Sequence, residues 1–384
     1  MSAQTMTTSW SARFDEFHER AAAQTGLSDF GGSDYHEGLR VLLAALDDRP
    51  PAAGTKTASA EGLIVAPLAA RLHTEAQWKA NPDYARREIP SPLIVMGVPR
   101  TGTTALHNLL DQDPQFQGIQ KWITGAPIVR PPREEWETHP QYQAAAANVA
   151  QMAAIAPDVM TAHGVYAHEV DECLLPMAQS FTSNFFPSQL DIPLYDQWLL
   201  GADETESFRR YKDVLRLVGL RDDRRWLLKN PSHVFGVEAM LAVFPDACVV
   251  QTHRHPASSL ASLVNLLDNI MRAYTGEGTD RPWRLARETA FWAEAMRRTV
   301  AIQDRYPDRF VNVRQGDIRQ DPLAVVRRIY GHFGIPISEE AERRFAAWAG
   351  ANPPEGQSAH AYEAVKDLSA INDAFGPYIE RYAL

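Results

Sequence analysis

The sequence predicts an α/β fold in which a central parallel sheet, containing a phosphate-loop-like strand, loop and helix, is flanked by helices. Two observations carry this prediction. The apolar run "PLIVMGVPR" (92–100) is typical of a buried strand in a parallel sheet, and apolar residues at helical spacing follow from Thr103. The same order of strand, turn and amphipathic helix recurs at 225–267, where two strands joined by a helix form a parallel crossover unit.

The remaining elements are expected around this core within a single domain, 1–384. Residues 1–90 are expected to form a helical N-terminal cap, and 91–340 the ligand-binding core. A helical, aromatic-rich insertion at about 120–220 interrupts that core, and we expect it to cover the carboxyl ends of the strands, where doubly wound folds bind ligands. Residues 341–384 are expected to form a closing segment. Further elements inside the core are a helix at 283–306, a strand at 308–314 and a helix from 322.

Composition limits the class of protein. The net charge of −10 argues against a surface that coats nucleic acid, so any anion site must be built locally. Only two cysteines, Cys173 and Cys248, are present, which excludes a disulfide scaffold and fits a reducing compartment. No secretory apolar region and no run of about 18 apolar residues is found, so we expect a cytoplasmic protein without a transmembrane segment.

The segment "GVPRTGTT" (97–104) has the form of a phosphate-binding loop. Gly97 and Gly102 allow a tight turn, and the amides of residues 101–104 should point at an anion on the N-terminus of the next helix. In the nucleotide-triphosphate motif G-x-x-x-x-G-K-[ST], the lysine position is here Thr103, which argues against a triphosphate ligand. Arg100 supplies a guanidinium within the loop instead.

Two motifs resemble those of sulfotransferases that use 3′-phosphoadenosine 5′-phosphosulfate (PAPS), in particular the broad bacterial branch of that family. The 5′-phosphosulfate loop of the family is matched by Arg100, Thr101, Gly102, Thr103 and Thr104. The segment "VVQTHRHPASSLASL" (249–263) resembles its 3′-phosphate motif, with Arg254, Pro256 and Ser262 in the matching places. Arg254 ends a strand, and Pro256 begins a helix that carries Ser262 two turns along.

The resemblance covers about residues 90–335 and implies PAPS as donor, adenosine 3′,5′-bisphosphate as product and a hydroxyl group as acceptor. It implies that the loop with Arg100 holds the 5′-phosphosulfate, and that Arg254 and Ser262 hold the 3′-phosphate.

Several features depart from the cytosolic branch of the family. Ala105 stands where that branch has an adenine-stacking tryptophan, and Gln315 or Gly316 replaces an aromatic residue in the late strand segment. The glycine-rich basic loop near the C-terminus and the short dimerisation motif are both absent, so the oligomeric state stays open. In the different ending at 356–382, the candidates for a closing contact are His360, Tyr362 and Lys366, and an ordinary surface tail is the alternative.

The segment "LLKNPSH" (227–233) offers a catalytic base. His233 is the first choice because imidazole titrates near neutrality, with Lys229 stabilising the leaving oxygen. A role as a helix-capping residue is the alternative for His233.

The rival base is Glu169, in the segment "HGVYAHEVDECLLPM" (163–177), because a buried carboxylate with a raised pKa could accept the proton. The spacing of His168 and Glu172 also suggests a metal site, but no third ligand is evident and none is expected. A solvated acidic helix start explains the same cluster.

The acceptor is expected to be a small apolar alcohol such as a lipid, sterol, terpenoid or polyketide-like molecule. Aromatic side chains in the insertion suggest an apolar pocket, although they could equally form the core of the helical region: Trp122, Trp136, Phe181, Phe185, Phe186, Tyr195 and Trp198.

Two other functions remain open at this point, an ATP-dependent small-molecule kinase and a non-catalytic nucleotide-binding module. The kinase needs an aspartate for Mg²⁺ on a neighbouring strand, and the strands at 225–229 and 248–253 end without one. The presence of Lys229 and His233 argues against the non-catalytic module.

Overall fold

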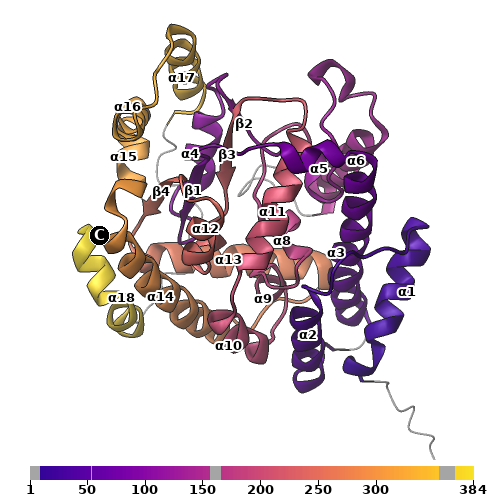
Figure 1. Ribbon diagram of the computed structural model, residues 1–384. Coiled ribbons are helices and arrows are strands. Elements are labelled where there is room, and N and C mark those ends of the chain that lie inside the picture. The colour runs from indigo at the N-terminus through magenta and orange to yellow at the C-terminus, as the bar shows by residue number, and fades with distance from the viewer. Residues whose placement is uncertain (1–8, 53, 156–165, 354–367) are drawn as a thin grey trace, which may run out of the picture.

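The computed structural model describes residues 9–52, 54–155, 166–353 and 368–384, and helices surround its five-stranded sheet (Figure 1). All neighbouring strands pair in parallel, in the order β2-β3-β1-β4-β5. The strands are β1 (Leu93–Gly97), β2 (Phe116–Gln117), β3 (Arg225–Lys229), β4 (Cys248–His253) and β5 (Phe310–Arg314). The predicted α/β class and parallel sheet are therefore confirmed.

The strand β2 was not expected from the sequence. It has two residues, and it pairs with β3 through Phe116 beside Arg225. A two-residue strand shows no alternation of apolar and polar side chains, so its pattern cannot be read locally.

The two faces of the sheet are covered by different helices. Alternate residues of a strand point to opposite faces, and here Ile94 and Met96 belong to one apolar core while Leu93 and Val95 belong to another. The first core includes α11 (Thr205–Val218), α12 (Val237–Val243), α13 (Pro256–Thr275), α14 (Arg281–Arg305) and α18 (Ser369–Tyr382). The second includes α4 (Thr103–Leu110), α15 (Gln315–Gln320), α16 (Pro322–Phe333) and α17 (Glu339–Ala351).

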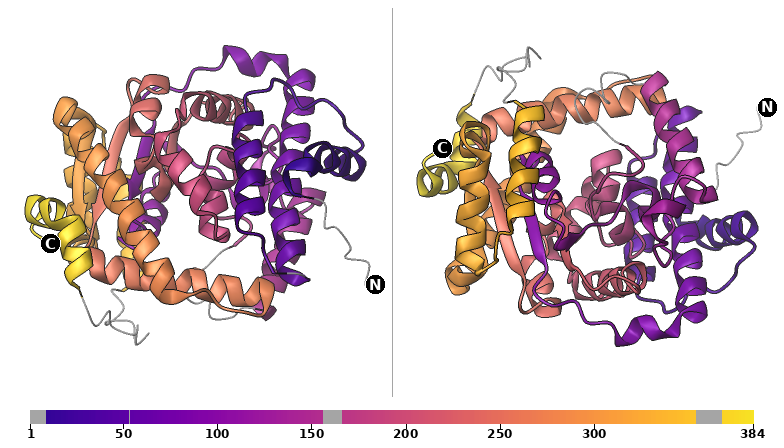
Figure 2. Two further views of the ribbon diagram at one scale, coloured as in Figure 1. Left: turned by 90° about the horizontal axis from the view of Figure 1, so that it is seen from below. Right: turned by 90° about the horizontal axis from the view of Figure 1, so that it is seen from above.

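The N-terminal region is helical, as expected, and forms a third core. Its elements are η1 (Ser11–Arg13), α1 (Phe14–Thr25), α2 (His36–Asp48), α3 (Thr55–Ala80) and η2 (Pro82–Arg86). Buried side chains of α1 to α3 contact those of the insertion, among them Phe181, Phe186 and Tyr195. In both further views these N-terminal helices lie on the side of the molecule opposite α15 to α17 (Figure 2).

The expected helical insertion lies between β2 and β3. It contains α5 (Lys121–Thr124), η3 (Arg133–Glu135), α6 (Pro140–Ile155), α8 (Leu174–Ala178), α9 (Phe185–Gln189), α10 (Pro193–Gly201) and α11. Before α8 the chain returns to the sheet, because the Asp171 amide donates to Ile119 O at 2.8 Å and the Cys173 amide donates to Lys229 O at 3.0 Å. The insertion thus brings its acidic segment to the carboxyl end of β3.

The crossover from β3 to β4 passes through η4 (Pro231–Val234) and α12, and that from β4 to β5 through α13, α14 and η5 (Pro307–Arg309). Pro256 occupies the first turn of α13, as the sequence indicates. The C-terminal helix α18 contacts the end of β4, where Tyr378 Oη and His253 Nδ1 are 2.8 Å apart and the Tyr382 ring stacks on the same imidazole. Cys173 and Cys248 are both buried thiols without a disulfide.

No helix within the described ranges combines the length and the apolar character that a membrane span requires.

Candidate active site

The loop between β1 and α4 requires glycine at two places. Gly97 has φ +145°, and a Cβ at this position would lie 2.5 Å from Thr252 O on the neighbouring strand β4. Gly102 has φ +93° and is the N-cap of α4, where it has no side chain that could cap the helix. The first amides of α4 have no intrahelical acceptor, so their N–H groups point out of the helix end, a geometry that suits an anion.

Residues from both sequence motifs converge on this loop. Arg100 lies in the left-handed region with φ +69°, which is uncommon for an arginine and typical of functional loops. Its Nε donates to Ser262 Oγ on α13 at 3.1 Å, and Arg254 Nη1 donates to Arg100 O at 3.3 Å. The loop at Arg100 is therefore joined to Arg254 and to Ser262, which lie 154 and 162 residues further along the chain, at one edge of the sheet.

The threonines of the loop have different surroundings. The Thr101 hydroxyl points into the protein, where it donates to Val98 O at 2.7 Å and lies 2.5 Å from Thr252 Oγ1. This fully buried side chain stabilises the loop, which leaves only its backbone for an anion. Thr103 is also buried, whereas the Thr104 hydroxyl accepts from Lys229 Nζ at 3.4 Å.

Lys229, at the end of β3, lies beside the acidic segment of the insertion. Its side chain is 2% exposed and forms an ion pair of 2.7 Å with Glu172. A second pair joins Lys121 Nζ and Asp171 Oδ2 at 2.9 Å. Burial raises the pKa of Asp171, but the ammonium groups of Lys121 and Lys229 outweigh it and the net shift is downward. These four residues form an alternating charge cluster next to the loop.

In the sequence Glu172 stands out as a member of the acidic group and, with His168, as a possible metal ligand, whereas Glu169 is the candidate base. In the structure Glu169 is half-buried, and burial raises its pKa, as expected. Burial raises the pKa of Asp111, at the C-cap of α4, and the negative charge of Glu169 raises it further. The residue that reaches Lys229 is Glu172, three positions further on.

The position of His233 does not support its expected role as the base. Its side chain is 1% exposed, and its ring lies 5.4 Å from the Phe208 ring and 6.3 Å from the Tyr211 ring, centroid to centroid. Neither ring nitrogen has a hydrogen-bond partner within the described part of the chain, and burial lowers the pKa to about 3. Pro231 begins a 3-10 turn directly after β3, and this turn directs His233 into the core. It is not a capping residue either, because Asn230 caps that turn.

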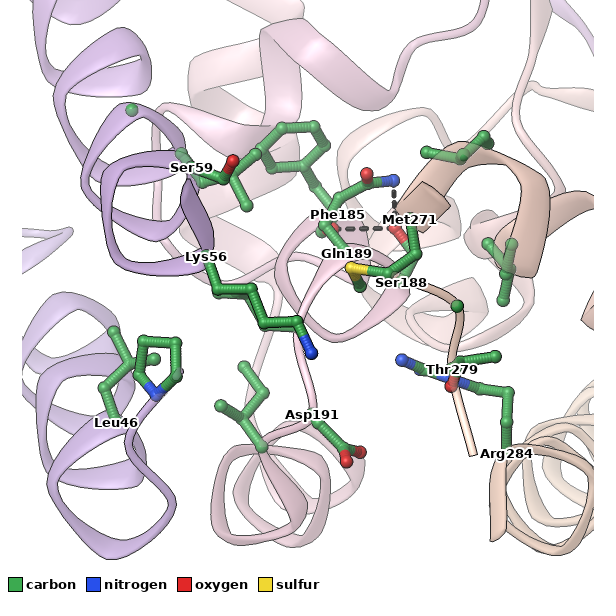
Figure 3. Close-up of a pocket in the computed structure, with 18 of the residues that line it drawn as sticks. Leu46, Lys56, Ser59, Phe185, Ser188, Gln189, Asp191, Met271, Thr279 and Arg284 are labelled. Atoms are coloured by element: carbon green, nitrogen blue, oxygen red, sulfur yellow. Dashed lines mark hydrogen bonds between the residues drawn. The ribbon is translucent and has the colours of Figure 1, made fainter. Parts of the chain in front are cut away.

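A cavity of about 870 Å³ extends from the charge cluster toward the N-terminal helices. Lys121, Asp171 and Glu172 line one part of it. Most of the remaining wall is apolar: Leu46, Leu63, Met152, Leu174, Leu175, Phe185, Leu190, Ile192, Leu267, Ile270 and Met271. Figure 3 shows Phe185 and Met271 from two different helices facing this space. Such a volume lies within the range of small-molecule sites.

The aromatic residues proposed to form an acceptor pocket mostly belong to the protein core. Only Phe185 of the seven lines the cavity. Trp122 and Trp136 are buried in the core on one face of the sheet, while Phe181, Phe186 and Tyr195 are buried in the N-terminal core, against which Trp198 packs. The sequence alone could not separate these two roles, because aromatic residues are common in both.

Two further expectations concern a metal site and a closing contact near the C-terminus. Within residues 9–52, 54–155, 166–353 and 368–384, no three His, Cys, Asp or Glu side chains form a group that could hold a metal ion. The closing-contact candidates His360, Tyr362 and Lys366 lie outside the described residues.

Comparison with known families decides the class of enzyme. The model of the "Sulfotransferase family" matches residues 92–339, which is more than half of the chain and contains both anion motifs and the charge cluster. The chain belongs to the sulfotransferase family. The family match confirms the resemblance seen in the two motifs. It supports a sulfotransferase rather than an ATP-dependent kinase or a non-catalytic nucleotide-binding module.

The relatives of this sulfotransferase align with most of its length. It is 24% identical over 302 residues to the omega-hydroxy-beta-dihydromenaquinone-9 sulfotransferase Stf3 of Mycobacterium bovis, covering 76% of this chain and 74% of that protein. Sulfotransferase STF1 from Mycobacterium tuberculosis H37Rv superposes with a TM-score of 0.86 at 33% identity, covering 96% of this chain and all of the other. For STF9 from Mycobacterium avium the TM-score is 0.81 at 25% identity, with 99% and 98% coverage.

Proposed function

We propose that this sulfotransferase uses PAPS as its donor and transfers the sulfuryl group to the hydroxyl of an apolar, lipid-like alcohol. The observation that carries the donor assignment is the convergence of Arg100, Arg254 and Ser262 beside the uncapped N-terminus of α4. One anion fits the helix N-terminus and Arg100. A second fits Arg254 and Ser262, and PAPS carries two such anionic groups.

The acceptor is proposed to lie in the 870 Å³ cavity with its hydroxyl at Glu172. Support comes from the position of the cavity, which joins the charge cluster to a long apolar wall. The name of the relative Stf3 also describes a hydroxylated menaquinone derivative, which is a lipid. An apolar body buried in this wall would leave the polar end of the molecule beside Lys229 and Glu172.

In this proposal Glu172 takes the proton from the acceptor hydroxyl as its oxygen bonds to sulfur. When bound, the donor supplies a sulfuryl group whose bond to the 5′-phosphate breaks, with the bisphosphate as leaving group. Lys229, which lies within 3.4 Å of the loop hydroxyl of Thr104, stabilises negative charge where that bond breaks. A carboxylate base contributes about 10²–10⁴-fold to such a reaction, and positioning and electrostatics contribute the rest.

The Lys229–Glu172 ion pair places both groups ready for these roles. Lys229 can exchange part of its contact with Glu172 for donor oxygens, because an ammonium group has three N–H donors. Glu172 then faces the cavity with a carboxylate oxygen available to the acceptor. Asp171 and Lys121 hold the adjacent backbone, since Lys121 N also donates to Glu169 O at 2.9 Å.

The donor assignment is tested by calorimetric titration with adenosine 3′,5′-bisphosphate and, separately, with ATP and Mg²⁺. Wild type should bind the bisphosphate more tightly than ATP, which has no 3′-phosphate. Arg254→Ala should weaken bisphosphate binding at least about tenfold, since hydrogen bonds to charged groups contribute about 1.5–3 kcal/mol. Arg343→Ala on the exposed face of α17 is the matched control. Equal binding of ATP, or an unchanged Arg254→Ala variant, would remove the 3′-phosphate assignment.

The base assignment is tested by comparing Glu172→Gln with Glu169→Gln. We expect kcat to fall about 10²-fold or more in Glu172→Gln, with bisphosphate affinity retained, and to change little in Glu169→Gln. The opposite pattern would transfer the role to Glu169.

A further inference from the structure

Two adjacent carboxylates of the insertion are paired with two different lysines. Asp171 Oδ2 lies 2.9 Å from Lys121 Nζ, and Glu172 Oε1 lies 2.7 Å from Lys229 Nζ. Lys121, Asp171 and Glu172 line the large cavity. Lys229 instead contacts the loop, where its Nζ is 3.4 Å from the Thr104 hydroxyl. The Lys121–Asp171 pair therefore lies on the acceptor side, next to the proposed base.

The backbone keeps Lys121 beside the acidic segment. Gln120 and Val170 form an antiparallel bridge, and Lys121 N donates to Glu169 O at 2.9 Å. A lysine side chain is long and flexible, with a compact charge at its end. Lys121 can therefore move its ammonium group from Asp171 to a neighbouring carboxylate without any change in this backbone pairing.

The negative charge of Asp171 is what Lys121 binds. Burial raises the pKa of Asp171, but the ammonium groups of Lys121 and Lys229 outweigh burial and the net shift is downward. Asp171 is therefore a carboxylate at neutral pH, in contact with the Lys121 ammonium group. The two opposite charges largely cancel each other at Glu172, because the field of a close ion pair falls off faster than that of a single charge.

Within the described chain, the other cations of the cavity wall also have carboxylates nearby. The pairs, with N–O distances of 2.9, 2.7 and 3.6 Å, are Arg49 with Asp191, Lys56 with Glu277 and Arg284 with Glu288. Figure 3 shows Lys56 and Arg284 entering the cavity from different helices, α3 and α14. Pairing of its cations suits a wall that receives a neutral, apolar acceptor, and the Lys121–Asp171 pair extends this pattern to the base.

We propose that Asp171 is a positioning residue that binds Lys121, holds it away from Glu172 and so keeps Glu172 available as the base. Once Lys229 has exchanged its contact with Glu172 for donor oxygens, a second ammonium group on Glu172 would make this carboxylate a weaker proton acceptor. Asp171 prevents that contact because it pairs with Lys121 itself. The inference rests on the proposed role of Glu172 as the base.

The test compares Asp171→Asn, Lys121→Met and the double variant by their steady-state kcat with PAPS and 1-decanol. Asp171→Asn keeps the size of the side chain but removes the charge that holds Lys121. We expect its kcat to fall at least about tenfold, because the change weakens a base that contributes about 10²–10⁴-fold. Adding Lys121→Met to Asp171→Asn should restore most of this loss, whereas Lys121→Met in wild type should not raise kcat. A purely structural role of Asp171 predicts no such rescue.

Asp196→Asn is the matched control, because it breaks another ion pair of the insertion, the one between Asp196 and Arg287, and should leave kcat unchanged. A crystal structure of Asp171→Asn with adenosine 3′,5′-bisphosphate gives a second measure that needs no turnover. We expect Lys121 Nζ to lie within about 4 Å of a Glu172 oxygen in this variant, the distance of an ion pair.

The outcomes separate this inference from the proposed function. A kcat loss that persists in the double variant, or a Lys121 side chain that stays away from Glu172 in Asp171→Asn, would overturn the role of Asp171. If Glu172→Gln lowers kcat but Asp171→Asn does not, only this inference fails. If Glu172→Gln keeps the kcat of wild type, the base assignment fails and the role of Asp171 fails with it. If wild type does not sulfate the alcohol, the proposed acceptor class fails and the crystal structure decides the role of Asp171.

Discussion

His233 tests the site because a catalytic base and a buried core residue predict different effects of the same substitution on activity and stability. The ring is buried between Phe208 and Tyr211, and neither nitrogen has a partner within the described residues. Phenylalanine fills nearly the same volume and leaves no polar atom unsatisfied. At neutral pH we therefore expect His233→Phe to change the free energy of unfolding by less than about 1.5 kcal/mol in either direction.

The size of the expected stability difference between wild type and His233→Phe follows from the pH dependence of the free energy of unfolding. Burial lowers the pKa of His233 from 6.5 to about 3, so the folded state binds the proton less readily than the unfolded chain. The contribution of the neutral histidine is fully present above pH 6.5 and is lost as the pH falls toward 3. The loss grows by about 1.4 kcal/mol per pH unit below 6.5, which amounts to roughly 3 kcal/mol at about pH 4.5. His233→Phe lacks this loss and should be more stable than wild type by about that amount at that pH.

Urea denaturation of both proteins at about pH 7.5 and about pH 4.5 measures this difference. Sulfotransferase activity and bisphosphate affinity are measured on the same samples. His332→Phe, the same substitution at an exposed position on α16, is the control for the change of side chain. A folded His233→Phe variant that retains bisphosphate affinity but loses activity would refute the core role and restore His233 as a catalytic group. An unchanged pH slope would refute the burial argument.

Three other predictions follow from the loop and the C-terminal helix. Gly97→Ala, which places a Cβ 2.5 Å from a backbone oxygen of β4, should lower the free energy of unfolding by at least about 2 kcal/mol in urea denaturation, whereas Gly125→Ala, in open space, should not. Tyr378→Phe should cost about 1–2 kcal/mol because it removes the partner of the buried His253 Nδ1, and an equal stability would show that the contact is dispensable. Arg100→Lys should lower kcat/KM at least about tenfold without a change in stability, because lysine cannot offer the two-pronged guanidinium contact; steady-state kinetics that match wild type would contradict this.

The fold was largely predictable because its signals are local. Residues 92–110 contain a buried strand, a glycine-dependent turn and a helix start within one short stretch, and the same pattern recurs around Arg254. The convergence of Arg100, Arg254 and Ser262 was also foreseeable, since strands of a parallel sheet end at the same edge. The strand β2 is not predictable from the sequence because two residues carry no periodicity.

The sequence by itself thus determined the class of fold, the glycine-dependent loop between β1 and α4, and the family to which the chain belongs. Only the tertiary structure decided which acidic residue meets Lys229, because Glu169, Asp171 and Glu172 are neighbours whose directions depend on how the insertion returns to the sheet. It also decided that His233 is buried, since its partners Phe208 and Tyr211 come from a helix that the local pattern around His233 does not contain. The large cavity is likewise a property of the folded chain, because its wall joins α2, α3, the insertion, α13 and α14, and no local pattern records which of their side chains face one another.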